Sequence, residues 1–284
     1  MSLLISGDLY LSRRDFDVNN GIIGWRNYVT ATGISADSSR EFFPPRNMAS
    51  PLTNPVWRSD SLSEQAITVN FDGVSDVDYI GIARHNLGSG DVQIAVQWRG
   101  ALDAEYEALI LPIRVGTDDP IIIRFRSILP ASIQIVLTPG DTKPAIGVLY
   151  MGELTALERN VYVGHTPISM AHTVRETVGI SEFGQYLGRV IKSEGRATSV
   201  ELSNLTPVWV RSKFEPFKQA RVPFFYSWRP RDYPLEIGYC WFPANHAPRP
   251  VNILPNGMMA ASFEMEGAGA LAIAQITEIA SDET

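Results

Sequence analysis

The first half of the chain has the hydrophobic pattern of a series of short β-strands. Segment 66–71 alternates apolar and polar residues, whereas segment 79–83 is almost continuously apolar, so we expect one half-exposed strand followed by one buried strand. Asp72 and Gly73 supply a turn signal between them. Further strands are predicted at residues 92–98, 121–126, 132–137 and 145–150, each bounded by Gly, Pro or Asp. Because none of the intervening segments has the periodicity of a crossover helix, the pattern predicts a β-sandwich or barrel.

The second half has a different pattern of apolar residues and glycines. From residue 153 onward, glycines interrupt short apolar runs such as 186–191, which indicates a second β-domain. We therefore predict two domains, at residues 1–152 and 153–284. One short helix is expected after Ser212, which forms a capping-box pattern with Glu215, and it should end near Ala220. Phe214 and Phe217 would then share one side of that helix.

Aromatic residues are concentrated between residues 222 and 242. Two strand-like runs, 222–228 and 236–242, flank a proline-rich connection and are predicted to pair as a hairpin, and a last strand is expected at 258–266. Most of this block should be core. The aromatic surface of Trp228, Tyr233 and Trp241 is nevertheless more than one small domain readily hides, which suggests a subunit interface. Residues 1–50 have the pattern of strand and loop. They would form either an outer strand or an N-terminal extension that docks on a neighbouring subunit.

Composition narrows the functional classes. A chain of 284 residues with 45% hydrophobic and 19% charged residues is typical of folded domains, and its net charge of −7 argues against nucleic acid as the main partner. The amino terminus lacks the pattern of a signal peptide, and no apolar run approaches a membrane span, so we expect synthesis and folding in a reducing cytoplasm. The single cysteine, Cys240, cannot form an intramolecular disulfide and is expected to be a small buried hydrophobe.

Signals for catalysis are weak, and we expect no enzyme, no cofactor and no metal. The four histidines are far apart, and nucleotide-binding and nucleophile-elbow motifs are missing. Glu105 and Glu107 would need to face each other across a cleft to act as a glycosidase pair. Loop carboxylates could bind Ca²⁺, although solvated loops are the interpretation that we favour; these are Asp72, Asp76, Asp78, Asp118 and Asp119.

One set of residues could recognise a ligand. Five side chains at predicted strand ends offer an aromatic face with hydrogen-bonding arms, as a sugar platform requires: Trp57, Arg58, Arg84, His85 and Asn86. The alternative is structural. Trp57 would anchor the core, Arg58 would satisfy loop carbonyls or a carboxylate, and His85 with Asn86 would cap a turn. We favour the structural interpretation.

Two motifs carry a family resemblance. Asn54-Pro55-Val56-Trp57-Arg58-Ser59, followed by an alternating strand and the run from Asp78 to Leu87, resembles the galactose-binding-like (discoidin-type) jelly-roll domains in tail proteins of tailed bacteriophages. More weakly, the Trp228-Arg229-Pro230 block with the closing run from Met259 to Met265 resembles the ring-forming or hub domains of distal tail and minor tail proteins. The resemblance implies an all-β fold with an N-terminal jelly-roll sandwich and a C-terminal β-barrel or sandwich domain that carries one short helix.

The same resemblance implies a function. It suggests a structural virion protein, a distal tail, baseplate or minor tail component that links the tail tube to the tip or fibres and is assembled in the host cytoplasm. The chain would form a homo-oligomeric ring, hexameric by resemblance. Its other partners would be tail tube, baseplate and fibre proteins. The ring contact is expected at Trp228 and Tyr233, with Arg229, Arg231 and Asp232 as orienting charges. The alternative is a carbohydrate-binding module that recognises a cell-surface glycan through loops at one end of the sandwich.

Overall fold

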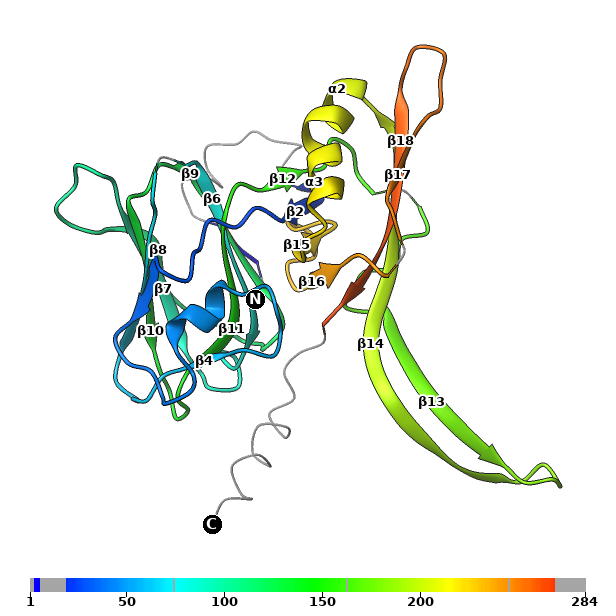
Figure 1. Cartoon of the computed structure of the whole chain (residues 1–284), viewed down its shortest axis with the longest axis horizontal. Coiled ribbons are helices and arrows are strands. Elements are labelled where there is room, and N and C mark those ends of the chain that lie inside the picture. The colour runs from blue at the N-terminus through cyan, green and yellow to red at the C-terminus, as the bar shows by residue number, and fades with distance from the viewer. Residues whose placement is uncertain (1–2, 6–18, 74, 162, 245, 269–284) are drawn as a thin grey trace.

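The described residues form an all-β fold with one α-helical segment and a short 3₁₀ helix, which confirms the predicted class (Figure 1). The computed structural model describes residues 3–5, 19–73, 75–161, 163–244 and 246–268, so the outer ends of the predicted domains lie outside the described residues. Within these ranges no helix is long and apolar enough to cross a membrane.

The first part is a jelly-roll of two five-stranded sheets. One sheet, which we call the inner sheet, has the order β1-β9-β6-β11-β4; the other, the outer sheet, has the order β3-β5-β10-β7-β8. The inner strands are β1 (Leu3–Ile5), β9 (Ile121–Ile128), β6 (Val77–His85), β11 (Ala145–Gly152) and β4 (Trp57–Arg58). The outer strands are β3 (Ile34–Ala36), β5 (Gln65–Asn70), β10 (Ser132–Thr138), β7 (Gln93–Arg99) and β8 (Glu107–Arg114). A short 3₁₀ helix, η2 (Pro45–Ala49), packs beside β11 and β4.

The predicted strands of the first half are confirmed, but one inferred connection is different. β5 pairs with β3 and β10, whereas β6 pairs with β9 and β11. The turn at Asp72 and Gly73 therefore carries the chain from one sheet to the other across the core, and does not join two paired strands. The apolar residues that alternate along β5 fill the space between the sheets, in a cluster that also contains Trp57 and Phe125.

The inner sheet is buried on both faces. β11 is buried at every position, and β6 is buried at most of its positions. One face contacts the jelly-roll core, and the other contributes Tyr79, Val148 and Tyr150 to a second cluster with Phe225 and Tyr239 of the C-terminal half. This double burial is the physical reason why segment 79–83 is continuously apolar.

The second part is an eight-stranded sheet. Its order is β12-β2-β15-β16-β18-β14-β13, and β17 pairs with β18 beside this path. The strands are β12 (Thr155–Ala156), β2 (Ile22–Gly24), β15 (Phe224–Ser227), β16 (Ile237–Trp241), β18 (Met259–Gly267), β14 (Tyr186–Leu205), β13 (His172–Ile180) and β17 (Arg249–Asn252). The predicted aromatic hairpin is confirmed as β15 and β16, and the predicted last strand is confirmed as β18.

The N-terminal residues are divided between the two parts. β1 and β3 are edge strands of the jelly-roll sheets, whereas β2 lies between β12 and β15 in the eight-stranded sheet. The segment 22–24 thus belongs to the second sheet although it precedes residue 152. The domain boundary near residue 152 stays a prediction.

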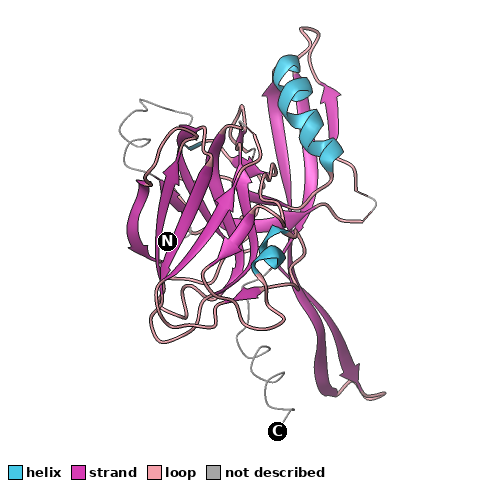
Figure 2. Cartoon of the chain, turned by 60° about the vertical axis from the view of Figure 1, so that its left-hand side comes forward, coloured by secondary structure: helices cyan, strands magenta, loops and turns pink. Residues whose placement is uncertain are grey.

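The helical segment is longer than the sequence indicated. It runs through α2 (Pro207–Trp209), the π-helical turn η3 (Val210–Phe214) and α3 (Glu215–Ala220). The N-cap is Thr206, whose Oγ1 accepts from the Trp209 N–H at 3.3 Å, so the predicted start at Ser212 is wrong. The predicted end is correct, because Arg221 has a φ of 48° and stops the helix. Phe214 and Phe217 are both buried in one cluster against the sheet, as predicted, and the helix lies across that face (Figure 2).

Candidate functional site

Trp57 and Arg58 of the predicted platform are held by the protein itself. Trp57 lies fully buried in the jelly-roll core, and its Nε1–H donates to the carbonyl of Ser38 at 3.0 Å. The Arg58 guanidinium lies over the ring of Phe43, 5.0 Å from its centroid. Burial, with a smaller effect of the Arg40 charge, lowers the pKa of Arg58 from its ordinary value. The face of the Trp57 ring is therefore not available to a sugar.

The other three platform residues lie at the end of β6, close to Trp57 in space. Ile146 of β11 is opposite both Trp57 and His85 in the register of its two neighbouring strands. Arg84, with a φ of 56°, donates from Nε to the Thr53 carbonyl at 3.3 Å. Asn86 donates to the Lys143 carbonyl at 3.0 Å and accepts from the Ala145 N–H at 2.7 Å. The structure brings the residues together, but their polar atoms bind neighbouring loops.

His85 is a buried structural histidine. Its Nε2 donates to the Asp119 carbonyl at 2.9 Å, and its Nδ1 accepts from the Leu87 N–H at 3.3 Å. Burial lowers the pKa of His85 to about 4, against the opposing effect of the nearby Asp118 carboxylate. The imidazole is therefore neutral at pH 7, and its two hydrogen bonds set the tautomer.

Three of the loop carboxylates considered for Ca²⁺ interact with groups of the protein itself, whereas Asp72 is exposed. Asp118 accepts from the N–H groups of Gly88 and Ser89, at 2.8 and 2.9 Å. Asp119 lies 3.5 Å from Arg196, which reaches across from β14. Asp78 accepts from the Leu154 N–H at 2.7 Å. Among the residues described, no group of three or more His, Cys, Asp or Glu side chains is placed to hold a metal ion.

The predicted interface residues form a compact turn after β15. The rings of Trp228 and Tyr233 stack with their centroids 5.3 Å apart and only 5° between their planes. The Arg229 guanidinium lies over the Trp228 ring, 5.2 Å from its centroid. Asp232 accepts from Asn19 at 2.6 Å and lies 3.8 Å from Arg229. Arg231 is exposed and Tyr233 remains 44% exposed.

Most of the aromatic block is core. Phe224 and Tyr226 are buried against the helix, and Phe225 and Tyr239 are buried against the inner sheet of the jelly-roll. Cys240 is buried among them as a free thiol, and burial raises its pKa. The aromatic excess that suggested an interface is thus largely used within the chain, where it joins the two parts.

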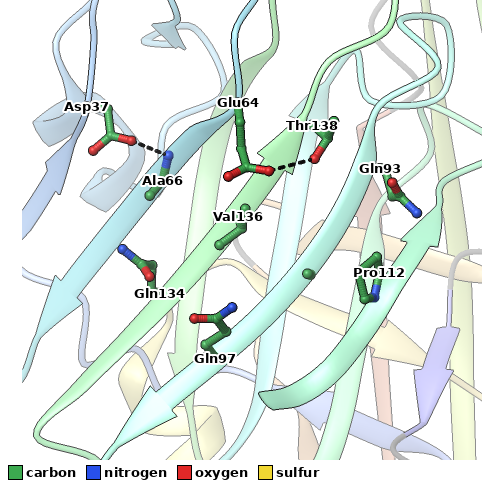
Figure 3. A pocket seen from close by; sticks show the side chains of 10 residues that line it. Asp37, Glu64, Ala66, Gln93, Gln97, Pro112, Gln134, Val136 and Thr138 are labelled. Atoms are coloured by element: carbon green, nitrogen blue, oxygen red, sulfur yellow. Dashed lines mark hydrogen bonds between the residues drawn. The ribbon is translucent and has the colours of Figure 1, made fainter. Parts of the chain in front are cut away.

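A groove of about 400 Å³ crosses the solvent face of the outer sheet (Figure 3). Its lining comes from four neighbouring strands and from the residues at their ends: Asp37, Glu64, Ala66, Gln93, Ala95, Gln97, Pro112, Gln134, Val136 and Thr138. Ala66, Val136 and Ala95 are in register with each other, so they form a continuous row of small apolar side chains. Polar residues lie on both sides of this row.

A group of exposed apolar residues lies on the hairpin of β13 and β14. We call residues 172–196 the arm; their strands pair with each other, and pairing of β14 with β18 begins at Arg196, which lies opposite Gly267. The arm curves away from the body of the molecule (Figure 1). Its exposed apolar residues are Val174, Val178, Ile180, Phe183, Tyr186, Leu187, Val190 and Ile191. Sequence reasoning missed the arm, although alternating runs on both sides of the turn at Gly184 were a signal for it.

No protein-family model matches this chain, and no curated protein matches it significantly. Several solved structures are similar to less than half of it. A CBM32 module of Clostridium perfringens, in complex with GalNAc-β-1,3-galactose, is 9% identical over 44% of this chain and 99% of the module, with a TM-score of 0.39. Chitosan-binding module 1 of a chitosanase/glucanase from Paenibacillus sp. IK-5 is 12% identical over 45% of this chain and 99% of its own, with a TM-score of 0.40.

A Ruminococcus gnavus fucosidase in complex with fucose is 17% identical, covering 47% of this chain and 27% of the enzyme, with a TM-score of 0.38. The resemblance to bacteriophage tail proteins has no counterpart among these three. At such identities and TM-scores the likenesses assign no function to this chain. What the structure itself establishes is a jelly-roll sandwich packed on a second β-sheet that carries a projecting arm.

Proposed function

We propose that this chain is a structural assembly subunit whose arm packs against a neighbouring copy. The observation that carries the proposal is the apolar surface of the arm, which no other described part of the chain covers: Phe183 is 92% exposed, and Leu187 and Val190 are 68% and 66% exposed. An isolated two-stranded hairpin is marginally stable in water, and the outer edge of β13 has unpaired backbone groups. Both features favour a partner that covers the arm.

Charge favours a second copy as that partner. Over residues 172–196 the arm has four basic and three acidic residues, whereas the whole chain has a net charge of −7. Contact between the weakly basic arm and the acidic body of another copy therefore meets no net electrostatic repulsion. Within the arm, Arg189 and Glu176 lie 3.5 Å apart, so two of its charges have a partner within the arm itself.

A ring requires two different patches on each subunit, because its contacts are head-to-tail. The arm would be one patch. The turn with Arg231 and Tyr233 offers the second, since both side chains are exposed on the body. Together with the sequence resemblance to distal tail and minor tail proteins, this arrangement supports a ring in a bacteriophage tail tip that links the tail tube to the tip or fibres.

The test is the mass of the protein in solution as a function of concentration. Replacing Phe183, Leu187 and Val190 with Ser should shift the oligomer to monomer, because these substitutions remove apolar area that only association would bury. The matched control replaces two exposed apolar residues of the body, Phe42 and Leu102, with Ser and should keep the oligomer.

A second variant distinguishes the two patches. Arg231→Glu with Tyr233→Ala should also weaken the oligomer if the turn contacts the neighbouring arm. A wild-type chain that stays monomeric at high concentration would overturn the assembly proposal. Detection of the chain in purified phage tails tests the virion assignment separately.

Carbohydrate binding by the jelly-roll is the second candidate function. The observation that favours it is the groove across the outer sheet, because amide and hydroxyl groups lie there on both sides of an apolar floor. At the loop end, the rings of Trp57 and His85 are buried and are not available to a ligand.

A further inference from the structure

We infer that the groove across the outer sheet binds an uncharged oligosaccharide. The inference rests on the second candidate function, carbohydrate binding, and specifies where the sugar lies and which class of sugar is accepted. It is independent of the assembly proposal, because the groove is formed by the outer sheet of the jelly-roll and includes no residue of the arm.

The floor of the groove suits the apolar faces of sugar rings. Val136 lies directly opposite Ala66 on one neighbouring strand and Ala95 on the other, so three small side chains form a row perpendicular to the strands. Pro112 of β8 continues the lining. Four adjacent strands at a spacing of about 4.8 Å span roughly 14 Å, which gives the floor the length of a short chain of rings rather than of a single monosaccharide.

Polar side chains form the two walls (Figure 3). On one side, Gln134 is in register with Gln97 and with Thr68, and its amide donates to the Thr68 hydroxyl at 3.5 Å. On the other side, Thr138 is in register with Gln93. Each glutamine amide offers two donors and an acceptor, so it can serve both roles of a sugar hydroxyl. Hydroxyl groups on both edges of a ring that lies on the floor would find partners.

The backbone geometry favours a sugar over a peptide. Extended peptides bind sheets at a free edge, where unpaired N–H and C=O groups are available. The groove lies over the middle of the sheet, where β10 is already paired on both sides, by β5 and by β7. A ligand there contacts side chains alone, and these are amides, a hydroxyl, two carboxylates and small apolar groups.

The charge of the groove selects uncharged sugars over anionic ones. Its two ionisable residues, Asp37 and Glu64, are acidic, and no basic residue lines it. Both carboxylates are held at the rim, Asp37 by the Ala66 N–H at 2.8 Å and Glu64 by the Thr138 hydroxyl at 3.3 Å. Arg114, opposite Gln93 in register, is paired with Asp91 outside the lining. A uronate would therefore approach fixed negative charges without a compensating cation.

The experiment measures binding of defined tetrasaccharides by isothermal titration calorimetry. The neutral probes are cellotetraose, xylotetraose, mannotetraose and tetra-N-acetylchitotetraose, and the anionic probe is tetragalacturonate. We expect at least one neutral probe to bind and tetragalacturonate not to bind. Because none of the lining residues is aromatic, the affinity should be modest.

Groove variants locate the site. Gln97→Ala with Gln134→Ala should weaken binding of the neutral probe at least tenfold, and Ala95→Leu should abolish it by filling the floor. The matched controls, Gln219→Ala on the helix and Ala101→Leu in an exposed turn, should bind like the wild type. Circular dichroism and thermal melting verify that each variant is folded.

Each alternative outcome overturns a different statement. If groove variants bind the neutral probe as well as the controls do, the site is elsewhere while carbohydrate binding stands. If only tetragalacturonate binds, the charge argument is wrong. If neither these probes nor a broad glycan array yields a ligand, both this inference and the carbohydrate-binding candidate are overturned, and the assembly proposal is unaffected.

Discussion

The hydroxyl of Tyr239 donates to the carbonyl of Pro51 at 2.7 Å, although the two residues are 188 positions apart in the chain. The bond lies beside the buried cluster that joins the inner sheet of the jelly-roll to the eight-stranded sheet. Within that cluster the Tyr150 hydroxyl donates to the Pro223 carbonyl at 3.2 Å and lies 3.4 Å from the Tyr239 hydroxyl. Burial raises the pKa of Tyr150, so it remains a neutral donor. Polar contacts thus fix the orientation of an otherwise apolar junction.

Tyr239→Phe should lower the free energy of unfolding by about 1–2 kcal/mol, because it leaves the Pro51 carbonyl without this donor while it keeps the ring packed. Chemical denaturation measures the change. Tyr233→Phe, at a ring that is 44% exposed and stacked on Trp228, is the matched control and should have almost no effect. Equal losses in the two variants would show that the Tyr239 hydroxyl does not stabilise the junction.

Trp57→Ala should destabilise the jelly-roll by roughly 3–5 kcal/mol, since it removes a fully buried ring from the core. Trp57→Phe should lower the free energy of unfolding by less, because it retains much of the apolar volume. It still loses the Nε1–H donor to the Ser38 carbonyl. Thermal and chemical unfolding measure both. If Trp57→Ala kept full stability and instead abolished binding to a glycan, the platform interpretation of Trp57 would replace the structural one.

His85 should make the protein less stable in mild acid. Burial lowers its folded-state pKa from the ordinary 6.5 to about 4, so the unfolded chain binds the proton more tightly than the folded protein. Stability is therefore fully present above pH 6.5 and is lost as the pH falls toward 4, by up to about 3 kcal/mol. Protonation would also remove the Nδ1 acceptor that Leu87 uses.

Denaturation midpoints measured between pH 7 and pH 4 give the slope of stability against pH. His85→Gln should flatten it, whereas His172→Gln, on the exposed arm, should retain the wild-type slope. His165, whose pKa is also lowered chiefly by burial, contributes in the same direction in both variants and so does not affect the comparison. An NMR titration in which the His85 ring protonates near its ordinary pKa would contradict the prediction.

Local patterns were sufficient to predict most strands. Period-two alternation identifies β5 because one face of that strand is buried and the other is not, and Asp72 and Gly73 mark the turn that follows it. The same reasoning found the hairpin of β15 and β16, and it placed Phe214 and Phe217 on one side of the helix. It also favoured the structural interpretation of Trp57 and His85, and both side chains are buried and hydrogen-bonded to backbone carbonyls.

Local patterns were insufficient wherever contacts with distant segments decide the structure. The predicted helix start was wrong because Thr206 and Ser212 are both residue types that favour N-caps, and Val210, which follows the earlier one, packs in the cluster against the sheet. The pairing of β2 with β15 joins residues about two hundred positions apart, which periodicity cannot specify. The groove likewise depends on the register that aligns Ala66, Val136 and Ala95.

The all-β class, the positions of most strands and the core character of the aromatic block follow from the local alternation of apolar and polar residues, so they can be predicted without coordinates. Which apolar faces are covered depends on contacts between segments that are distant in the chain. The apolar residues of β6 meet the second sheet and are buried, whereas those of the arm meet no other described part of the chain and stay exposed. Burial is a property of the contacts between distant segments, so one apolar run of sequence can become buried core while another stays on the surface.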